Sequence, residues 1–324
     1  MKQTRLRLLI ALPFVFVALI IGLAVWYVAG HDVPVLQPRG EIGASEQRLM
    51  ILALLMSTIV VIPVFVMTVV ISWRYRQGNP KRKQYRPDWD SSKLYETIWW
   101  GIPILIIGVL CVVTWVSSHQ LDPYRKLNPE APQQKIQVVA LDWKWLFIYP
   151  DKHIASVNEL VIPTNQTISF DITSDTVMNS FWIPALGSQI YAMPGMSTAL
   201  HLNATEPGTY YGSPANISGS GFASMTFKVR AVSPNEYDAW VLGTQNASRN
   251  LTMAAYDALA KPSKNNKVEY FAPVQDGLYD DIVMKYMLPA DQPQSQSSDT
   301  STKTDDNMNM NMDMHTPMEM DMTR

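Results

Sequence analysis

The apolar residues of this 324-residue chain are concentrated in three long runs near its N-terminus. The runs cover residues 6–30, 49–73 and 97–118. A helix needs about 20 apolar residues to cross a bilayer, and the second and third runs reach that length without an internal charge. Pro63 and Pro103 are tolerable kinks in such helices. We therefore expect a transmembrane helical hairpin over residues 45–120.

The loop between these two runs indicates the orientation of the hairpin. Residues 74–93 contain seven lysines and arginines against only Asp88 and Asp90. The positive-inside rule places such a loop in the cytoplasm. Everything after residue 118 is then expected outside the membrane.

The first apolar run allows two interpretations. It follows Lys2, Arg5 and Arg7, as a signal peptide would, and residues 28–30 (VAG) could serve as a small-residue cleavage site. Signal peptides have apolar regions of about 7 to 15 residues, and this run is longer. Its length favours an uncleaved anchor over residues 1–30, with a cleaved signal as the alternative.

Alternating apolar and polar positions replace the long runs after a Pro-rich linker. Short segments rich in β-branched and aromatic residues, separated by Pro, Gly and Asn, fill residues 133–231. This spacing is typical of an antiparallel β-sandwich or barrel. Trp143 and Trp145 are two residues apart, so on a strand they would share one face and pack in the core.

A helical pattern follows the strands, over residues 232–288. Ser233, Pro234 and Glu236 have the spacing of a capping box at a helix N-terminus, and two more helices are expected near residues 252–260 and 276–287. The polar composition of residues 289–324 predicts a disordered tail. Its alternating methionines and His315 could bind Cu(I) through thioethers, but we favour a low-complexity tail without a partner.

Charge and cysteine content limit the kinds of ligand and metal site that the chain can have. The net charge is −2, which does not indicate nucleic-acid binding. The one cysteine, Cys111, lies inside the third apolar run. An intrachain disulfide and any metal site that needs two thiolates are therefore excluded.

Two stretches have the form of a copper site without its ligands: VMNSFWIP at residues 177–184 and PANISGSGFASM at 214–225. Together with the helical hairpin, they resemble subunit II of the heme–copper respiratory oxidases over residues 40 to 288. In the cytochrome c oxidases of that family the sandwich is a cupredoxin that holds a two-copper centre, CuA. Its ligands come from an HSFxxP stretch and a CxxxCxxxHxxM loop, whose thiolates, imidazoles and thioether suit copper.

Aligned on those motifs, four ligand positions hold residues that cannot replace the ligands. Asn179 and Phe222 stand at the histidine positions, Pro214 and Ser218 at the cysteine positions, and Met225 is retained. The resemblance therefore implies a cupredoxin-like domain without CuA. Trp143 stands where cytochrome c oxidases have the tryptophan that receives electrons, and without CuA we interpret it as a packing residue.

Other stretches are similar to subunit II of the bo-type ubiquinol oxidases, among them VVALDWKWLFIYP, VMNSFWIPALGSQIYAM and EPGTYYG. Residues 233–288 are similar to the aromatic-rich C-terminal extension of that family. One departure is the absence of a lipobox cysteine near residues 24–32.

That resemblance implies a subunit without its own redox centre in a proton-pumping oxidase of the bacterial inner membrane. Subunit I would hold the hemes, CuB and the quinol site, and the other partners would be further oxidase subunits and membrane lipid. The sandwich would lie in the periplasm. The alternatives are a CuA-type cytochrome c oxidase subunit II and a free-standing copper-binding module of the envelope.

Glu96 has two interpretations. An acidic residue in the first turn of a helix interacts favourably with the helix dipole, and acidic residues near a membrane are often functional. It precedes Pro103 by seven positions, which matches the family's glutamate at the entrance of the K proton pathway. The resemblance favours that second role.

Overall fold

The computed structural model describes residue 19, residues 22–23, 25–31, 33–75, 90–128, 130 and 133–287. Most of the expected N-terminal anchor lies outside the described residues, as do residues 76–89 of the predicted cytoplasmic loop. The Met-rich tail with His315 also lies outside them.

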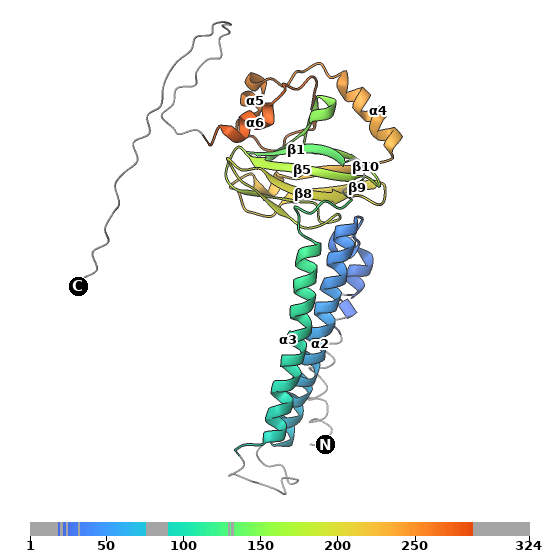
Figure 1. Ribbon diagram of the computed structural model, residues 1–324, viewed down its shortest axis with the longest axis vertical. Helices are drawn as coiled ribbons and strands as arrows, with labels where there is room; N and C mark the ends of the chain where they lie inside the picture. The colour runs from blue at the N-terminus through green and yellow to red at the C-terminus, as the bar shows by residue number, and fades with distance from the viewer. Residues whose placement is uncertain are drawn as a thin grey trace, which may run out of the picture. The chain divides into compact units, whose positions relative to one another are not determined.

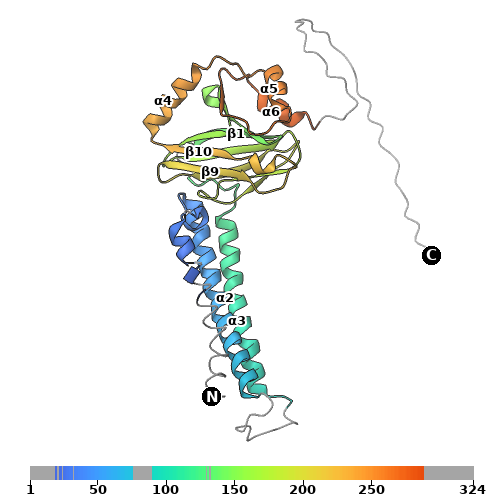
Figure 2. The same ribbon diagram turned by 180° about the vertical axis from the view of Figure 1, so that it is seen from behind.

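Two long helices form the predicted hairpin. They are α2 (Glu41–Arg74) and α3 (Lys93–Gln120), and a short 3-10 turn, η1 (Pro34–Leu36), precedes them. Both are long and apolar enough to cross a membrane, and they run side by side in Figures 1 and 2. At 1.5 Å per residue, α2 is about 50 Å long, more than the roughly 30 Å core of a bilayer. Its polar first turns, before the apolar run, can therefore project beyond the hydrocarbon.

Two sheets pack face to face after the hairpin. The strand order of the six-stranded sheet is β11-β3-β2-β1-β5-β8, and that of the five-stranded sheet is β4-β10-β9-β6-β7. The first sheet consists of β1 (Gln133–Leu141), β2 (Lys144–Tyr149), β3 (Ile154–Val157), β5 (Thr167–Ser174), β8 (Thr198–Asn203) and β11 (Glu269–Phe271). The second consists of β4 (Glu159–Pro163), β6 (Asn179–Trp182), β7 (Ile190–Ala192), β9 (Gly208–Pro214) and β10 (Phe227–Val232).

The expectation of a purely antiparallel sandwich is wrong at two pairings. Strand β1 pairs in parallel with β5, and β10 pairs in parallel with β4. The chain leaves the first sheet after β3, forms β4 in the second sheet, and returns to place β5 beside β1. Such crossovers bring together segments that are distant in sequence, so local alternation does not reveal them.

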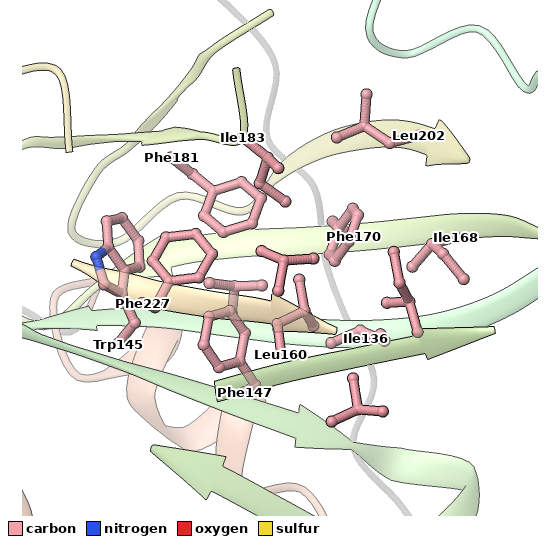
Figure 3. Close-up of a cluster of buried hydrophobic side chains, with 14 of the residues drawn as sticks. Ile136, Trp145, Phe147, Leu160, Ile168, Phe170, Phe181, Ile183, Leu202 and Phe227 are labelled. Atoms are coloured by element: carbon pink, nitrogen blue, oxygen red, sulfur yellow. The ribbon is translucent and has the colours of Figure 1, made fainter. Parts of the chain in front are cut away.

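Aromatic side chains fill the space between the sheets (Figure 3). Phe181 and Phe227 stack with centroids 5.3 Å apart and planes 6° from parallel. Trp145 meets Phe181 edge-on at 5.5 Å, and Phe147 lies 5.1 Å from Phe227. Burying such large rings supplies the main stabilisation of a sandwich of this size.

Trp143 departs from the strand pattern. It lies in the turn between β1 and β2 with φ 61°, a left-handed conformation. The alternation argument therefore holds for Trp145, which is fully buried, and is wrong for Trp143. Trp143 still packs, half-buried, against the same core cluster.

The C-terminal segment places its last two helices on the outer face of the six-stranded sheet (Figure 1) and packs its first helix against the core between the sheets. It contains α4 (Pro234–Gln245), α5 (Met253–Ala260) and α6 (Leu278–Met284). The capping box of Ser233 and Glu236 is confirmed. Strand β11, between α5 and α6, was not expected; it adds this segment to the sheet beside β3. A second core forms where Tyr256 and Ile282 pack with Leu146.

Replacing Gly212 by alanine should destabilise the sandwich. A Cβ there would lie 2.0 Å from the Phe227 ring, and overpacking of this kind costs about 1–3 kcal/mol. We expect a lower melting temperature of the detergent-solubilised chain. Gly243→Ala is the control, because its Cβ meets nothing within 4 Å in helix α4 and alanine favours helices. Equal melting temperatures for the two variants would contradict this packing.

Candidate functional site

The positions predicted to match the family's copper ligands lie at the start of β6, at the end of β9 and in the loop that follows β9. Asn179 is the first residue of β6, and Phe181 of that strand pairs with Pro214 at the end of β9. The Ser180 hydroxyl donates to Asn216 Oδ1 at 2.6 Å, which joins β6 to the loop that follows β9. Sheet pairing therefore holds positions 179 and 214–218 near one another.

The loop folds back on itself between Ser218 and Met225. The Ser218 hydroxyl lies 3.9 Å from the Met225 sulfur, and Met225 is fully buried in the core cluster. The Met225 carbonyl accepts from the Trp145 indole at 3.3 Å. Phe222 begins the short 3-10 turn η3 (Phe222–Ser224). Core contacts thus fix the retained methionine.

The Trp143 ring packs against the loop at residues 218–221. Its indole donates to the Ser218 carbonyl at 3.2 Å, and a Cβ at Gly221 would lie 2.2 Å from its ring. Gly219 has φ +110°, a conformation that favours glycine. The glycines of SGSG therefore let the loop lie against the ring. The spacing of residues does not predict this contact, although the repeated Gly and Ser are a signal for a loop that lies close to a neighbour.

Asn179, which we predict to match a histidine ligand of the family, is fully buried. Its Nδ2 donates to the Val177 carbonyl at 3.0 Å, and its Oδ1 has no hydrogen-bond partner among the described residues. The polar atoms offered by the ligand positions are thus an amide, a hydroxyl and a thioether. This set does not fit a thiolate-bridged two-copper centre, because soft bridging sulfur and imidazole are both missing.

Glu96 does not join these residues. It lies in the first turn of α3, at the end of the hairpin opposite the linker to the sandwich. Its Oε1 accepts the Ser92 backbone N–H at 3.1 Å, so the side chain caps the helix. The second carboxylate oxygen is not engaged by that contact. Capping and proton handling are therefore compatible at this residue.

A buried carboxylate, Asp175, ties the C-terminal segment to the sandwich. Its side chain is 1% exposed and accepts from the Tyr256 and Tyr286 hydroxyls, both at 2.7 Å. The Lys285 ammonium lies 2.9 Å from Oδ1. Burial, with the bond to Asp175, raises the pKa of Tyr256 far above its ordinary value, so this tyrosine stays a donor. The sequence carried no signal for this contact because its partners are distant along the chain.

Comparison with known proteins identifies the family. The model of the family described as cytochrome c oxidase subunit II, periplasmic domain, matches residues 150–232, and that of the COX aromatic rich motif matches 245–290. The ubiquinol oxidase subunit 2 of Acetobacter aceti is 49% identical over 80% of this chain and 84% of its own length. The cytochrome bo(3) ubiquinol oxidase subunit 2 of Pseudomonas aeruginosa is 47% identical over 79% of this chain and 77% of its own length.

This chain belongs to the family of ubiquinol oxidase subunits 2. A more distant member, the quinol oxidase subunit 2 of Bacillus cereus, is 36% identical over 70% of this chain and 78% of that protein. The solved periplasmic domain of the cytochrome oxidase subunit II CoxB of Bradyrhizobium japonicum is 29% identical, with a TM-score of 0.34. The match covers 36% of this chain and 94% of that domain.

As a packing residue of this quinol oxidase family member, Met225 should tolerate leucine. A volume-conserving change in a core costs less than about 1.5 kcal/mol, so we expect Met225→Leu to leave quinol turnover within about twofold. Met225→Ala is the matched control: it leaves a cavity and should cost about 2–5 kcal/mol. Turnover and melting temperature of the purified complex check both. Loss of turnover in a fully folded Met225→Leu complex would show a chemical role for the thioether.

Asp175→Asn should loosen the C-terminal segment. The amide has one acceptor oxygen where the carboxylate serves three donors, and leaving the buried Tyr256 hydroxyl unsatisfied would cost about 1–3 kcal/mol. We expect faster hydrogen exchange in residues 253–286 of the purified complex. Asp238→Asn, on the exposed face of α4, should change nothing. Equal hydrogen exchange in the Asp175→Asn and Asp238→Asn complexes would show that the Asp175 contacts do not hold the C-terminal segment in place.

Proposed function

We propose that this chain is the non-redox subunit 2 of a proton-pumping ubiquinol oxidase in a bacterial inner membrane. The complex would oxidise ubiquinol and reduce dioxygen to water. Each quinol supplies two electrons and dioxygen requires four, so two quinols are oxidised for each dioxygen. Hemes, CuB and the quinol site would lie in subunit I.

The observation that carries this proposal is the state of the former ligand positions. The sandwich is kept, with its aromatic core complete, while Asn179, Ser218 and Met225 present donors that do not suit a two-copper centre. An enzyme that receives electrons from a soluble cytochrome needs an external relay. A quinol dissolved in the membrane can deliver its electrons directly to subunit I, so the relay is unnecessary.

The role left to this chain is positional. The hairpin would pack against subunit I, and the sandwich would form a periplasmic cap on the complex. The names of the relatives support this assignment over a CuA-type subunit or a free-standing copper-binding module.

The test of this function is the electron donor used by the purified complex. We expect oxygen consumption with ubiquinol and none with reduced cytochrome c, and copurification of this chain with a heme-bearing subunit after mild detergent extraction. Turnover with cytochrome c, or purification without any heme protein, would overturn the proposal.

Glu96 would serve at the cytoplasmic entrance of the proton pathway. Glutamine retains an oxygen that can accept the Ser92 N–H, so Glu96→Gln separates capping from proton transfer. Loss of a positioned proton-transfer group costs on the order of 10²-fold or more. We therefore expect much slower turnover and heme reduction with unchanged assembly.

Asp90→Asn is the control for this experiment, because Asp90 is an exposed carboxylate just before the same helix. It should leave turnover unchanged. If Glu96→Gln matched it in turnover and in heme reduction kinetics, Glu96 would be a capping residue only.

A further inference from the structure

A cavity of about 570 Å³ opens at the outer end of the hairpin. Its walls are the first turns of α2, the last turn of α3 and the linker that follows α3. We call it the outer pocket. Its apolar side includes Leu49, Leu52 and Leu121.

Three cationic side chains line the outer pocket: Arg48, Arg125 and Lys126. All three are exposed, and none forms an ion pair within the described residues. The Arg48 guanidinium donates to the Ser45 hydroxyl at 2.9 Å, which leaves most of its donors available. Cations gathered without partners at a concave surface favour an anionic ligand.

Two acidic residues, Glu41 and Asp122, also line the pocket, so its formal charge is +1. The Asp122 carboxylate is already engaged, since its Oδ1 accepts the Tyr124 N–H at 2.9 Å. Neither acid neutralises the three cations by direct contact.

The walls of the pocket are held in place. His201 Nδ1 lies 3.0 Å from the Pro123 carbonyl, which fastens the linker to strand β8. The Arg125 N–H donates to the Asp122 carbonyl in a turn. On the other wall, Asn203 Oδ1 accepts the Glu41 N–H at 3.0 Å and caps α2. Arg125 and Arg48 are thus carried on backbone that the sandwich fixes.

The outer pocket lies where the apolar run of α2 begins. Leu49 begins the apolar run of α2, and Arg48 immediately precedes it. Ser117 and Gln120, near the end of α3, line the same pocket. If the hairpin spans the bilayer, the three cations lie at the level of the lipid headgroups, and Leu49 and Leu52 lie at the level of the acyl chains.

We propose that the outer pocket binds the headgroup of an anionic phospholipid of the outer leaflet; this rests on the membrane placement given under the proposed function. Arg48 and Arg125 can each bind phosphate oxygens through two N–H groups, and Lys126 adds a point charge. A zwitterionic lipid offers the same phosphate but adds a cation that the surplus positive charge disfavours. The acyl chains would lie against the leucine side.

Native mass spectrometry of the complex, purified in mild detergent, tests the proposal by counting retained phospholipids. The triple variant Arg48→Gln, Arg125→Gln, Lys126→Gln should retain about one anionic phospholipid fewer per complex than the wild type. The control is Lys228→Gln, Lys261→Gln, Lys267→Gln, three exposed lysines of the external domain; it should retain the wild-type number. Equal numbers in the two triple variants would overturn the proposal.

A second measurement uses the wild-type complex and does not depend on assembly of the variants. Photoreactive phosphatidylglycerol should label peptides within residues 41–52 and 117–127 more than photoreactive phosphatidylcholine does. Equal labelling of these peptides by the two lipids would overturn it. Quinol turnover of the same sample shows separately whether the proposed function holds.

Discussion

The stacked rings of Phe181 and Phe227 are the contact on which the external domain depends. They come from β6 and β10, in the same sheet, and receive Trp145 and Phe147 from the opposite sheet. The loop at residues 215–226 joins β9 to β10, and β9 pairs with both β6 and β10. Because rings from both sheets hold these strands together, the loop needs no metal to bridge its ends. The copper ligands could therefore be replaced without loss of the frame.

Close backbone contacts also fix the junction between the hairpin and the sandwich. The N-cap residue of α2 is Gly40, which has no side chain to cap the helix, and Asn203 of β8 supplies the cap. A Cβ at Gly40 would lie 2.4 Å from the Asn203 carbonyl, and the Gly43 N–H donates to the Leu186 carbonyl at 2.9 Å. These contacts transmit the position of the membrane helix to the sandwich through the backbone. A subunit with a positional role requires such a junction.

Much of this architecture could be predicted from the sequence, because its signals are local. Run length predicted the hairpin, alternation predicted the strands, and motif spacing located Asn179 and Met225. The parallel pairing of β1 with β5 could not be predicted, since it depends on a crossover between sheets. Nor could the turn at Trp143, which depends on space left by Gly221. Asp175 meets Tyr256 and Tyr286 across 81 and 111 positions, beyond any periodic pattern.

The most direct test of the central claim is a copper titration of the purified full-length chain, followed by near-infrared absorption. Copper content alone does not decide it, because the methionines of the tail could take up Cu(I) without forming a thiolate-bridged centre. The near-infrared band of a mixed-valence two-copper centre requires bridging thiolates, and the only cysteine is Cys111 in α3. We predict that no such band develops at any copper concentration. A band that grows to saturation would contradict the account.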